Sequence, residues 1–322
     1  MQYVGLHTQQ VRNNFRSALL LCMFPCLVIL LTFLFSFLLV FFTSENGESV
    51  DVWGQSITLV RQLAPFLLGG VVIWFVIAYF ANTSIIRSAT GARQLERKDN
   101  KRVYNLVENL CIGQGIPMPQ INIIDDDSLN AFASGIDKRT YTVSLSRGII
   151  DKLDDEELES VIAHELSHIR NNDVRLLIVS IVFVGIFAML AQIAFNVLRY
   201  APRRSSNKNG GGGIIVIILI ALVVAGLGYF FASLMRFAIS RNREYMADAG
   251  SAEMTRKPQM LANALRKISQ DPDIEAVTRS DVAQLFIEHP NSKENSRLFS
   301  GISGLFATHP PIEKRIAVLE QF

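Results

Sequence analysis

The feature that most constrains the fold of this chain is a set of four long windows that contain no charged residue and no histidine. They run over residues 17–44, 62–86, 176–198 and 214–235. Each window holds about 22 residues or more, and a helix of that length crosses the roughly 30 Å hydrocarbon core of a bilayer. The windows therefore predict an integral membrane protein with about four transmembrane helices and the lipid bilayer as a partner.

The composition agrees with this class and argues against others. Only 19% of the 322 residues are charged, against about a quarter in a typical soluble domain. The net charge of +2 is too small to indicate a nucleic-acid-binding protein, so we expect no nucleic-acid partner. The three cysteines, Cys22, Cys26 and Cys111, form neither a disulfide framework nor a metal-binding pair.

The windows divide the chain into a membrane anchor and a split soluble domain. We expect residues 1–86 to form an uncleaved N-terminal anchor with two spans, because the first window is too long for a signal-peptide core. Residues 87–175 form the first part of the soluble domain, residues 176–235 a hydrophobic hairpin, and residues 236–322 the second part of the soluble domain.

Lysine and arginine residues beside the windows predict the orientation. Basic residues precede the first window and follow the second and fourth, whereas the loop between the first two windows is mainly acidic. This bias places the soluble domain in the cytoplasm. The basic loop after the third window disagrees, so the hairpin 176–235 either crosses the bilayer or is a buried helical pair.

The soluble part has the pattern of an α+β fold. Helical spacing of apolar residues predicts a helix over about 96–111. Alternating β-branched and aromatic residues predict strands at 120–124 and 141–145, with a short strand and turn at 130–135. We expect a mainly helical membrane protein whose soluble domain contains a small β-sheet.

The most informative helix is predicted to begin at Asp154, which can cap it together with Glu157 three residues later. On this helix His164 and His168 are one turn apart and face the same way, so both imidazoles can bind one zinc ion. Glu165 can act as general base, which completes the H-E-x-x-H arrangement. The polar residues 171–173 separate this helix from the third window, and the sequence leaves open whether they break it.

A catalytic zinc ion needs a third protein ligand. The extended H-E-x-x-H-x-x-G-x-x-H pattern is excluded because Asn171 and Val174 stand where it needs glycine and histidine. Glu244 is the best candidate, with Asp248 on the same helix face to hydrogen-bond a ligand histidine. The alternative is a solvated charged helix in which arginines 241 and 243 pair with these carboxylates.

Four motifs carry a resemblance to a known family. They are His-Glu-Leu-Ser-His at 164–168, Glu-Tyr-Met-Ala-Asp-Ala at 244–249, Asn-Ala-Phe-Ala-Ser-Gly at 130–135, and Thr-His-Pro-Pro at 308–311 followed by Arg315. Taken in their order along the chain, they resemble the HtpX heat-shock zinc proteases, which are membrane relatives of the prenyl-protein peptidases. The resemblance implies a zincin-like catalytic domain, Glu244 as third zinc ligand, and a protein-quality-control role in the bacterial inner membrane.

The resemblance also implies roles for other residues. Asn130, Ala131, Phe132 and Ala133 are expected to form an edge strand that lies along the substrate backbone. By similarity His309 donates a hydrogen bond to the oxyanion; the alternative is a turn histidine held by the prolines that follow. Arg315 is expected to support Asp248 or His309.

We therefore expect an integral membrane zinc endopeptidase with one zinc ion per chain. His168 lies about eight residues before the third window, which places the site within roughly two helical turns of the membrane surface. The expected substrates are proteins or peptides, mainly membrane or misfolded proteins. A structural zinc scaffold is disfavoured because no cysteine lies near either motif. A transporter is disfavoured because the windows contain no aspartate, glutamate, lysine, arginine or histidine. The sequence makes no prediction of the oligomeric state.

Overall fold

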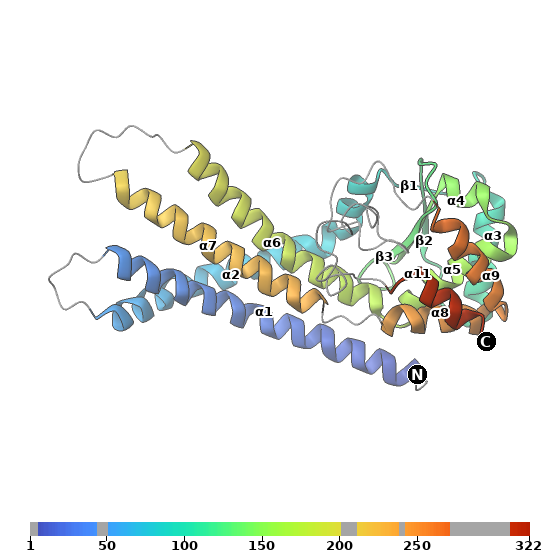
Figure 1. Ribbon diagram of the computed structural model, residues 1–322, viewed down its shortest axis with the longest axis horizontal. Coiled ribbons are helices and arrows are strands. Elements are labelled where there is room, and N and C mark those ends of the chain that lie inside the picture. Colours follow the sequence, from blue (N-terminus) through green and yellow to red (C-terminus); the bar gives the residue numbers. More distant parts are fainter. Residues whose placement is uncertain (1–5, 44–50, 201–210, 238–241, 271–309) are drawn as a thin grey trace. The chain divides into compact units, whose positions relative to one another are not determined.

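The computed structural model describes residues 6–43, 51–200, 211–237, 242–270 and 310–322 (Figure 1). The chain divides into two compact units, which are considered separately. One unit consists of Ser17–Tyr79 and Val179–Ala238. The other contains Phe80–Ile178 and Ile239–Phe322 together with the first sixteen residues.

Long helices form the first unit, and each contains one of the four uncharged windows. They are α1 (Leu6–Thr43), α2 (Val52–Thr90), α6 (Asp173–Tyr200) and α7 (Gly211–Phe237), of which α1, α2 and α6 continue into the second unit. Within the described residues, two segments are long and apolar enough to cross a membrane, namely Cys22–Phe42 and Val52–Ala81. A shorter apolar segment, Val216–Phe231, lies in α7. For the third and fourth predicted spans, at 176–198 and 214–235, the prediction therefore rests on the sequence windows alone.

Close packing in this unit depends on a small residue. The rings of Phe24 in α1 and Phe187 in α6 lie 5.6 Å apart. A Cβ atom on Gly228 of α7 would lie 2.3 Å from the ring of Phe187, so only glycine leaves room for this ring. Small residues at helix contacts are typical of membrane helices, because they allow close van der Waals packing between helices.

The second unit contains a four-stranded mixed sheet in the order β1-β2-β4-β3. The strands are β1 (Arg93–Gln94), β2 (Gln120–Ile124), β3 (Ala131–Ser134) and β4 (Thr142–Ser146). β2 and β4 are parallel, whereas β1 pairs antiparallel with β2 and β3 pairs antiparallel with β4. β3 therefore forms one edge of the sheet among the described strands, as expected from the sequence.

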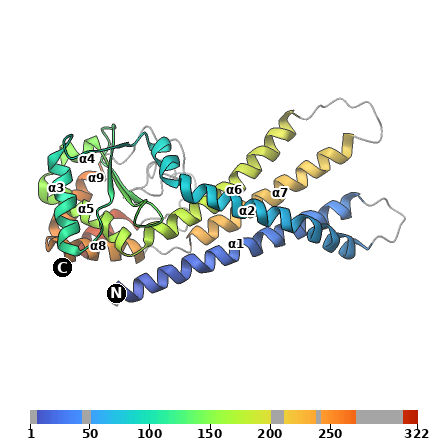
Figure 2. The same ribbon diagram turned by 180° about the vertical axis from the view of Figure 1, so that it is seen from behind.

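Six further helices of the second unit lie among the described residues, and Figure 1 and Figure 2 show them around the sheet. They are α3 (Lys101–Gln114), α4 (Arg147–Lys152), α5 (Asp155–Arg170), α8 (Asn242–Thr255), α9 (Pro258–Ile268) and α11 (Ile312–Leu319). α5 is central, since it packs against α3, α8, α9 and the edge strand β3. Nearly all of its residues after the first turn are buried. The two histidines of the sequence motif lie on this helix.

Both ends of α5 follow from local chemistry. Asp154 accepts hydrogen bonds from the amides of Glu156 and Glu157, and the Glu157 carboxylate accepts one from the Asp154 amide, so the expected capping box is present. At the other end Asn172 has a φ angle of 59°, a left-handed conformation that asparagine tolerates better than most residues. The polar residues after α5 thus break the helix, and α6 begins at Asp173.

Candidate metal centre

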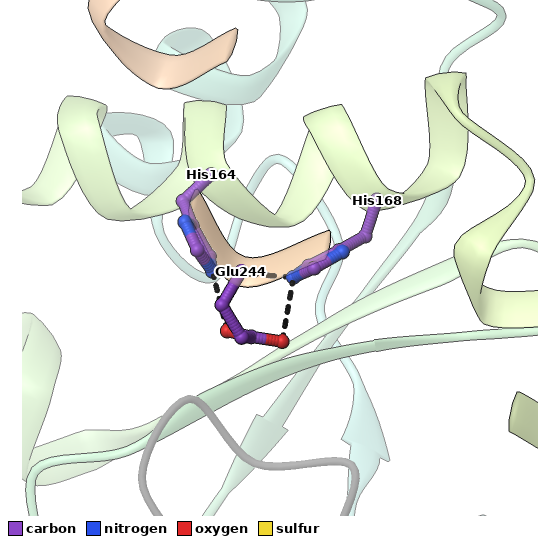
Figure 3. A group of neighbouring side chains, drawn as sticks. All are labelled: His164, His168 and Glu244. Atoms are coloured by element: carbon purple, nitrogen blue, oxygen red, sulfur yellow. Dashed lines mark hydrogen bonds and ion pairs between the residues drawn. The ribbon is translucent and has the colours of Figure 1, made fainter. Parts of the chain in front are cut away.

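Three side chains converge between α5 and α8 (Figure 3). His164 and His168 lie on successive turns of α5, and their Nε2 atoms are 3.2 Å apart. Glu244, in the first turn of α8, places Oε2 3.7 Å from Nε2 of His164 and Oε1 3.7 Å from Nε2 of His168. One imidazole nitrogen from each histidine and the carboxylate therefore face a common point.

The donor set and its spacing fit a zinc ion. Ligands at 2.0–2.1 Å in tetrahedral geometry lie roughly 3.3 Å from one another, and the three donor pairs here are separated by 3.2–3.7 Å. Two imidazoles and one carboxylate make a three-ligand set, which is typical of catalytic zinc because a fourth position stays open for water or substrate. Burial of His164 and Glu244 keeps competing water away from the ligands.

Glu165 lies next to this point and contacts the edge strand. Its side chain is buried on α5, and the backbone amide of Ala133 in β3 donates a hydrogen bond to its carboxylate. Burial raises the pKa of Glu165, and the neighbouring histidines only partly oppose this shift. A carboxyl group with a raised pKa accepts and releases a proton closer to neutral pH, as a general base requires.

The strand β3 is held in place through its first residues. The Asn130 side chain accepts a hydrogen bond from the Ala131 amide, and Oγ of Ser146 accepts one from the Asn130 amide. Ser146 also caps α4, so the entry to β3 is tied to the next helix. Asn130, Ala131, Phe132 and Ala133 are all buried.

Asp248 and Arg315 form a buried pair beside His164, and Nη2 of Arg315 lies 3.5 Å from Nε2 of that histidine. Oδ1 of Asp248 lies 3.0 Å from Nδ1 of His164, on the side of the ring away from the other ligands. Arg315, from α11, donates to both carboxylate oxygens of Asp248, at 2.9 and 2.6 Å. The third guanidinium nitrogen of Arg315, Nη1, lies 3.6 Å from Oε2 of Glu244. One arginine thus contacts both carboxylates of α8.

These contacts shift the protonation of the group. Burial acts to raise the pKa of Asp248, but the Arg315 charge and the contact with His164 outweigh it and lower that pKa. Burial acts to lower the pKa of His164, yet the contacts with the carboxylates of Asp248 and Glu244 raise it to about 9. In the metal-free site His164 therefore favours the protonated form, so a metal ion must displace a proton to bind.

The position of α8 decides between the two interpretations of its carboxylates. Glu244 and Asp248 are both buried, so they do not lie on a solvated charged face. Arg243 points elsewhere, since it donates to the backbone oxygen of Asp173 at 3.2 Å. The expected interaction of Arg315 with Asp248 is present. His309, expected opposite the metal, lies outside the described residues, as does Arg241.

The sequence analysis missed one residue of this group, Asp173. Its Oδ2 lies 3.0 Å from Nδ1 of His168. Each histidine thus has its own buried carboxylate on the ring nitrogen that faces away from the other ligands. The sequence shows only that an acidic residue follows His168 by five positions; the helix start that brings its carboxylate to His168 is seen in the structure.

Comparisons of this chain with a family model and with individual proteins agree on one family. Residues 97–322 match the model of peptidase family M48. The Protease HtpX homolog of Bacteroides fragilis is 66% identical over 328 residues and covers 100% of both chains. The homolog from Dictyoglomus turgidum is 41% identical over 77% of this chain and 80% of that protein. The homolog from Lactobacillus helveticus is 34% identical over 98% of this chain and 99% of that protein.

A solved structure is also similar, namely the crystal structure of S. mikatae Ste24p. It has a TM-score of 0.46 and 18% sequence identity, covering 97% of this chain and 66% of that chain. The match to the family model contains both metal-site motifs, and the relatives extend the similarity over the whole chain. The chain therefore belongs to peptidase family M48 and is a zinc metalloprotease.

Proposed function

We propose that this protein is an integral membrane endopeptidase that cleaves membrane or misfolded proteins at the cytoplasmic surface of the bacterial inner membrane, as part of protein quality control. The observation that carries the catalytic part is the convergence of His164, His168 and Glu244 beside the buried carboxylate of Glu165. A peptide-hydrolysing zinc site needs these two components, a three-ligand metal site and a base next to it.

The three ligands hold one zinc ion per chain. When bound, zinc lowers the pKa of a coordinated water and polarises a carbonyl oxygen. Glu165 takes the proton from the attacking water and passes it to the leaving amine of the cleaved peptide bond. Asp248 holds His164 in the tautomer that leaves Nε2 free for the metal, and Arg315 keeps Asp248 ionised.

The edge strand supplies the substrate site in this proposal. A peptide aligned with Asn130, Ala131, Phe132 and Ala133 gains backbone hydrogen bonds that do not depend on its side chains, which suits cleavage of many sequences. The Ala133 amide is within hydrogen-bond reach of Glu165, which supports placing the scissile bond near this end of the strand. His309 is proposed to stabilise the oxyanion.

The membrane part of the proposal comes from the sequence windows. Residues 1–86 form the anchor, and the hairpin 176–235 adds the third and fourth spans between the two parts of the catalytic domain. The flanking lysines and arginines indicate a cytoplasmic catalytic domain. α5 ends at Arg170, only a few residues before the third window, so substrates in or near the bilayer are the natural class.

The decisive experiment separates the base from the ligands. The full chain is purified in detergent as wild type, Glu165→Gln and Glu244→Ala, and casein cleavage and bound zinc are measured. Glu156→Gln is the matched control, because Glu156 lies on the same helix but pairs with Lys257 at the surface. We expect Glu165→Gln to keep zinc and lose cleavage, and Glu244→Ala to lose both. Full cleavage by Glu165→Gln contradicts the proposal.

A further inference from the structure

Asp173 stands at the point where the metal-binding helix ends and the next long helix begins. It is the first residue of α6, and its side chain is only 2% exposed. Its carboxylate lies 3.0 Å from Nδ1 of His168. Burial of a carboxylate costs free energy unless a hydrogen-bond or charge partner compensates it, so this contact is a specific one.

The chain geometry brings Asp173 back onto α5. Asn171 caps the helix, and its amide bonds to the carbonyl of Ser167 at 2.9 Å. Asn172 then adopts its left-handed conformation and turns the chain. Because the turn is this tight, the first side chain of α6 reaches a histidine five residues earlier.

A second contact ties Asp173 to α8. Arg243, directly before Glu244 in sequence, donates to the backbone oxygen of Asp173 at 3.2 Å. The start of α6 therefore contacts the helices that carry His168 and Glu244. The position of Asp173 therefore depends on α5 and α8, and the contacts of Asp173 in turn help to hold these two helices in place.

We propose that Asp173 is a positioning residue that orients His168 for metal binding and stabilises the tautomer with its proton on Nδ1. With that proton donated to Asp173, Nε2 keeps its lone pair toward Glu244 and His164. Asp173 thus does for His168 what Asp248 does for His164. The inference rests on the proposed role of His168 as a zinc ligand.

The physical reason is general to metal-binding histidines. A carboxylate on the far ring nitrogen fixes the ring rotation and increases the electron density on the ligating nitrogen, and its loss typically lowers metal affinity about 10–100-fold. Asp173→Asn keeps the size and a possible acceptor at the start of α6 but removes the charge. Asp173→Ser removes the contact and keeps a residue that suits a helix start.

The test measures metal binding directly. Zinc affinity of the full chain is determined by competition with a chromogenic chelator, and the visible spectrum is recorded at saturating cobalt. The variants are Asp173→Asn, Asp173→Ser, His168→Ala and, as matched control, Glu157→Gln. Glu157 is another buried carboxylate of α5, but it caps the helix and binds Lys267.

We expect Asp173→Asn and Asp173→Ser to bind zinc about 10–100-fold more weakly and to show altered cobalt bands even at saturation. Glu157→Gln should keep the wild-type zinc affinity and cobalt bands. Wild-type affinity and spectrum in both Asp173 variants, with loss of zinc in His168→Ala, overturn this inference alone. Retained zinc in His168→Ala overturns the proposed site itself. If neither Asp173 variant folds, Asp173 acts in folding and the positioning role is wrong.

Discussion

Arg315 is the largest fully enclosed side chain among the described residues. A buried guanidinium is stable only when its charge is balanced, and here Asp248 binds it with both oxygens while Glu244 lies close by. The pKa of Arg315 is raised, because the charges of these carboxylates outweigh the effect of burial, so it stays positively charged. One residue of α11 thus balances the negative charge that α8 brings to the metal site.

Replacement of Arg315 by a neutral residue of similar length should therefore destabilise the protein strongly. We expect Arg315→Met to cost about 3–5 kcal/mol of unfolding free energy, because Asp248 is left buried without its cation. The measurement is thermal unfolding of the chelator-treated protein in detergent, so that zinc does not contribute. The control is Arg266→Met, which removes a surface pair with Glu320 and should cost less than about 1 kcal/mol. Similar losses in the two variants would contradict this role of Arg315.

Individual residues also show what the sequence could and could not predict. Glu244 and His168 were found because each belongs to a short motif with a fixed helical spacing. The contact between Asp248 and Arg315 joins residues 67 positions apart, and only the family resemblance indicated it. Asp173 was missed because its contact with His168 depends on the left-handed turn at Asn172, which no periodicity reveals.

At the scale of elements, the site depends on how closely α8 approaches α5. A Cβ atom on Gly250 would lie 2.1 Å from Oγ and 2.9 Å from Cβ of Ser167, so a larger residue would push the helices apart. About two turns away from that contact on α5, the Ser160 carbonyl accepts a hydrogen bond from the Ser251 hydroxyl at 2.7 Å. These small residues let Glu244 and Asp248 reach the histidines.

Gly250→Ala should therefore weaken the metal site from a distance. We expect a loss of about 1–3 kcal/mol of stability from overpacking and a weaker zinc affinity, because α8 carries Glu244 and Asp248 with it when it moves. The second variant, Gly250→Ala with Ser167→Gly, removes the obstructing atoms and should recover most of both losses. Zinc titration and thermal unfolding measure the two effects. An unchanged zinc affinity in Gly250→Ala would show that the contact between Gly250 and Ser167 does not determine the geometry of the metal site.

The elements predicted best were those with local signals. Two elements occur at the predicted residues, namely the capping box at Asp154 and Glu157 and the strand 120–124. Capping and alternation depend only on residues that are close in the sequence, so the sequence is enough to predict them. The helix expected at 96–111 instead begins after its cap at Asn100 and ends at the left-handed Gly115. Arg61 bounds the second uncharged window but does not end the helix, since α2 begins at Val52. A single charged residue costs a helix little where it can reach water.

At the scale of the whole molecule, two topologies of the hairpin 176–235 differ in the side of the membrane on which its loop lies. If both windows cross the bilayer, the loop between them faces the side opposite to the catalytic domain. If they form a buried helical pair, that loop lies on the same side as the domain. The apolar windows favour crossing, whereas the basic residues of the loop favour the second arrangement.

Single-cysteine labelling distinguishes the two arrangements. We expect Ser205→Cys, in a chain without Cys22, Cys26 and Cys111, to react with a membrane-impermeant maleimide added to intact spheroplasts. Lys98→Cys, an exposed position before α3, is the control and should react only after the membrane is opened. Labelling of both positions only after opening would show that the hairpin does not cross.

The sequence order of the metal-site residues has a consequence for biosynthesis. The two histidines and Glu165 are made first, the 60-residue hairpin segment follows, and only then come Glu244, Asp248 and finally Arg315. Because synthesis runs from the N-terminus, a chain that is still being translated holds His164, Glu165 and His168 before Glu244 exists. In the proposed mechanism such a nascent chain has no complete metal site, so it cannot cleave a peptide until synthesis has passed residues 176–235 and reached Glu244.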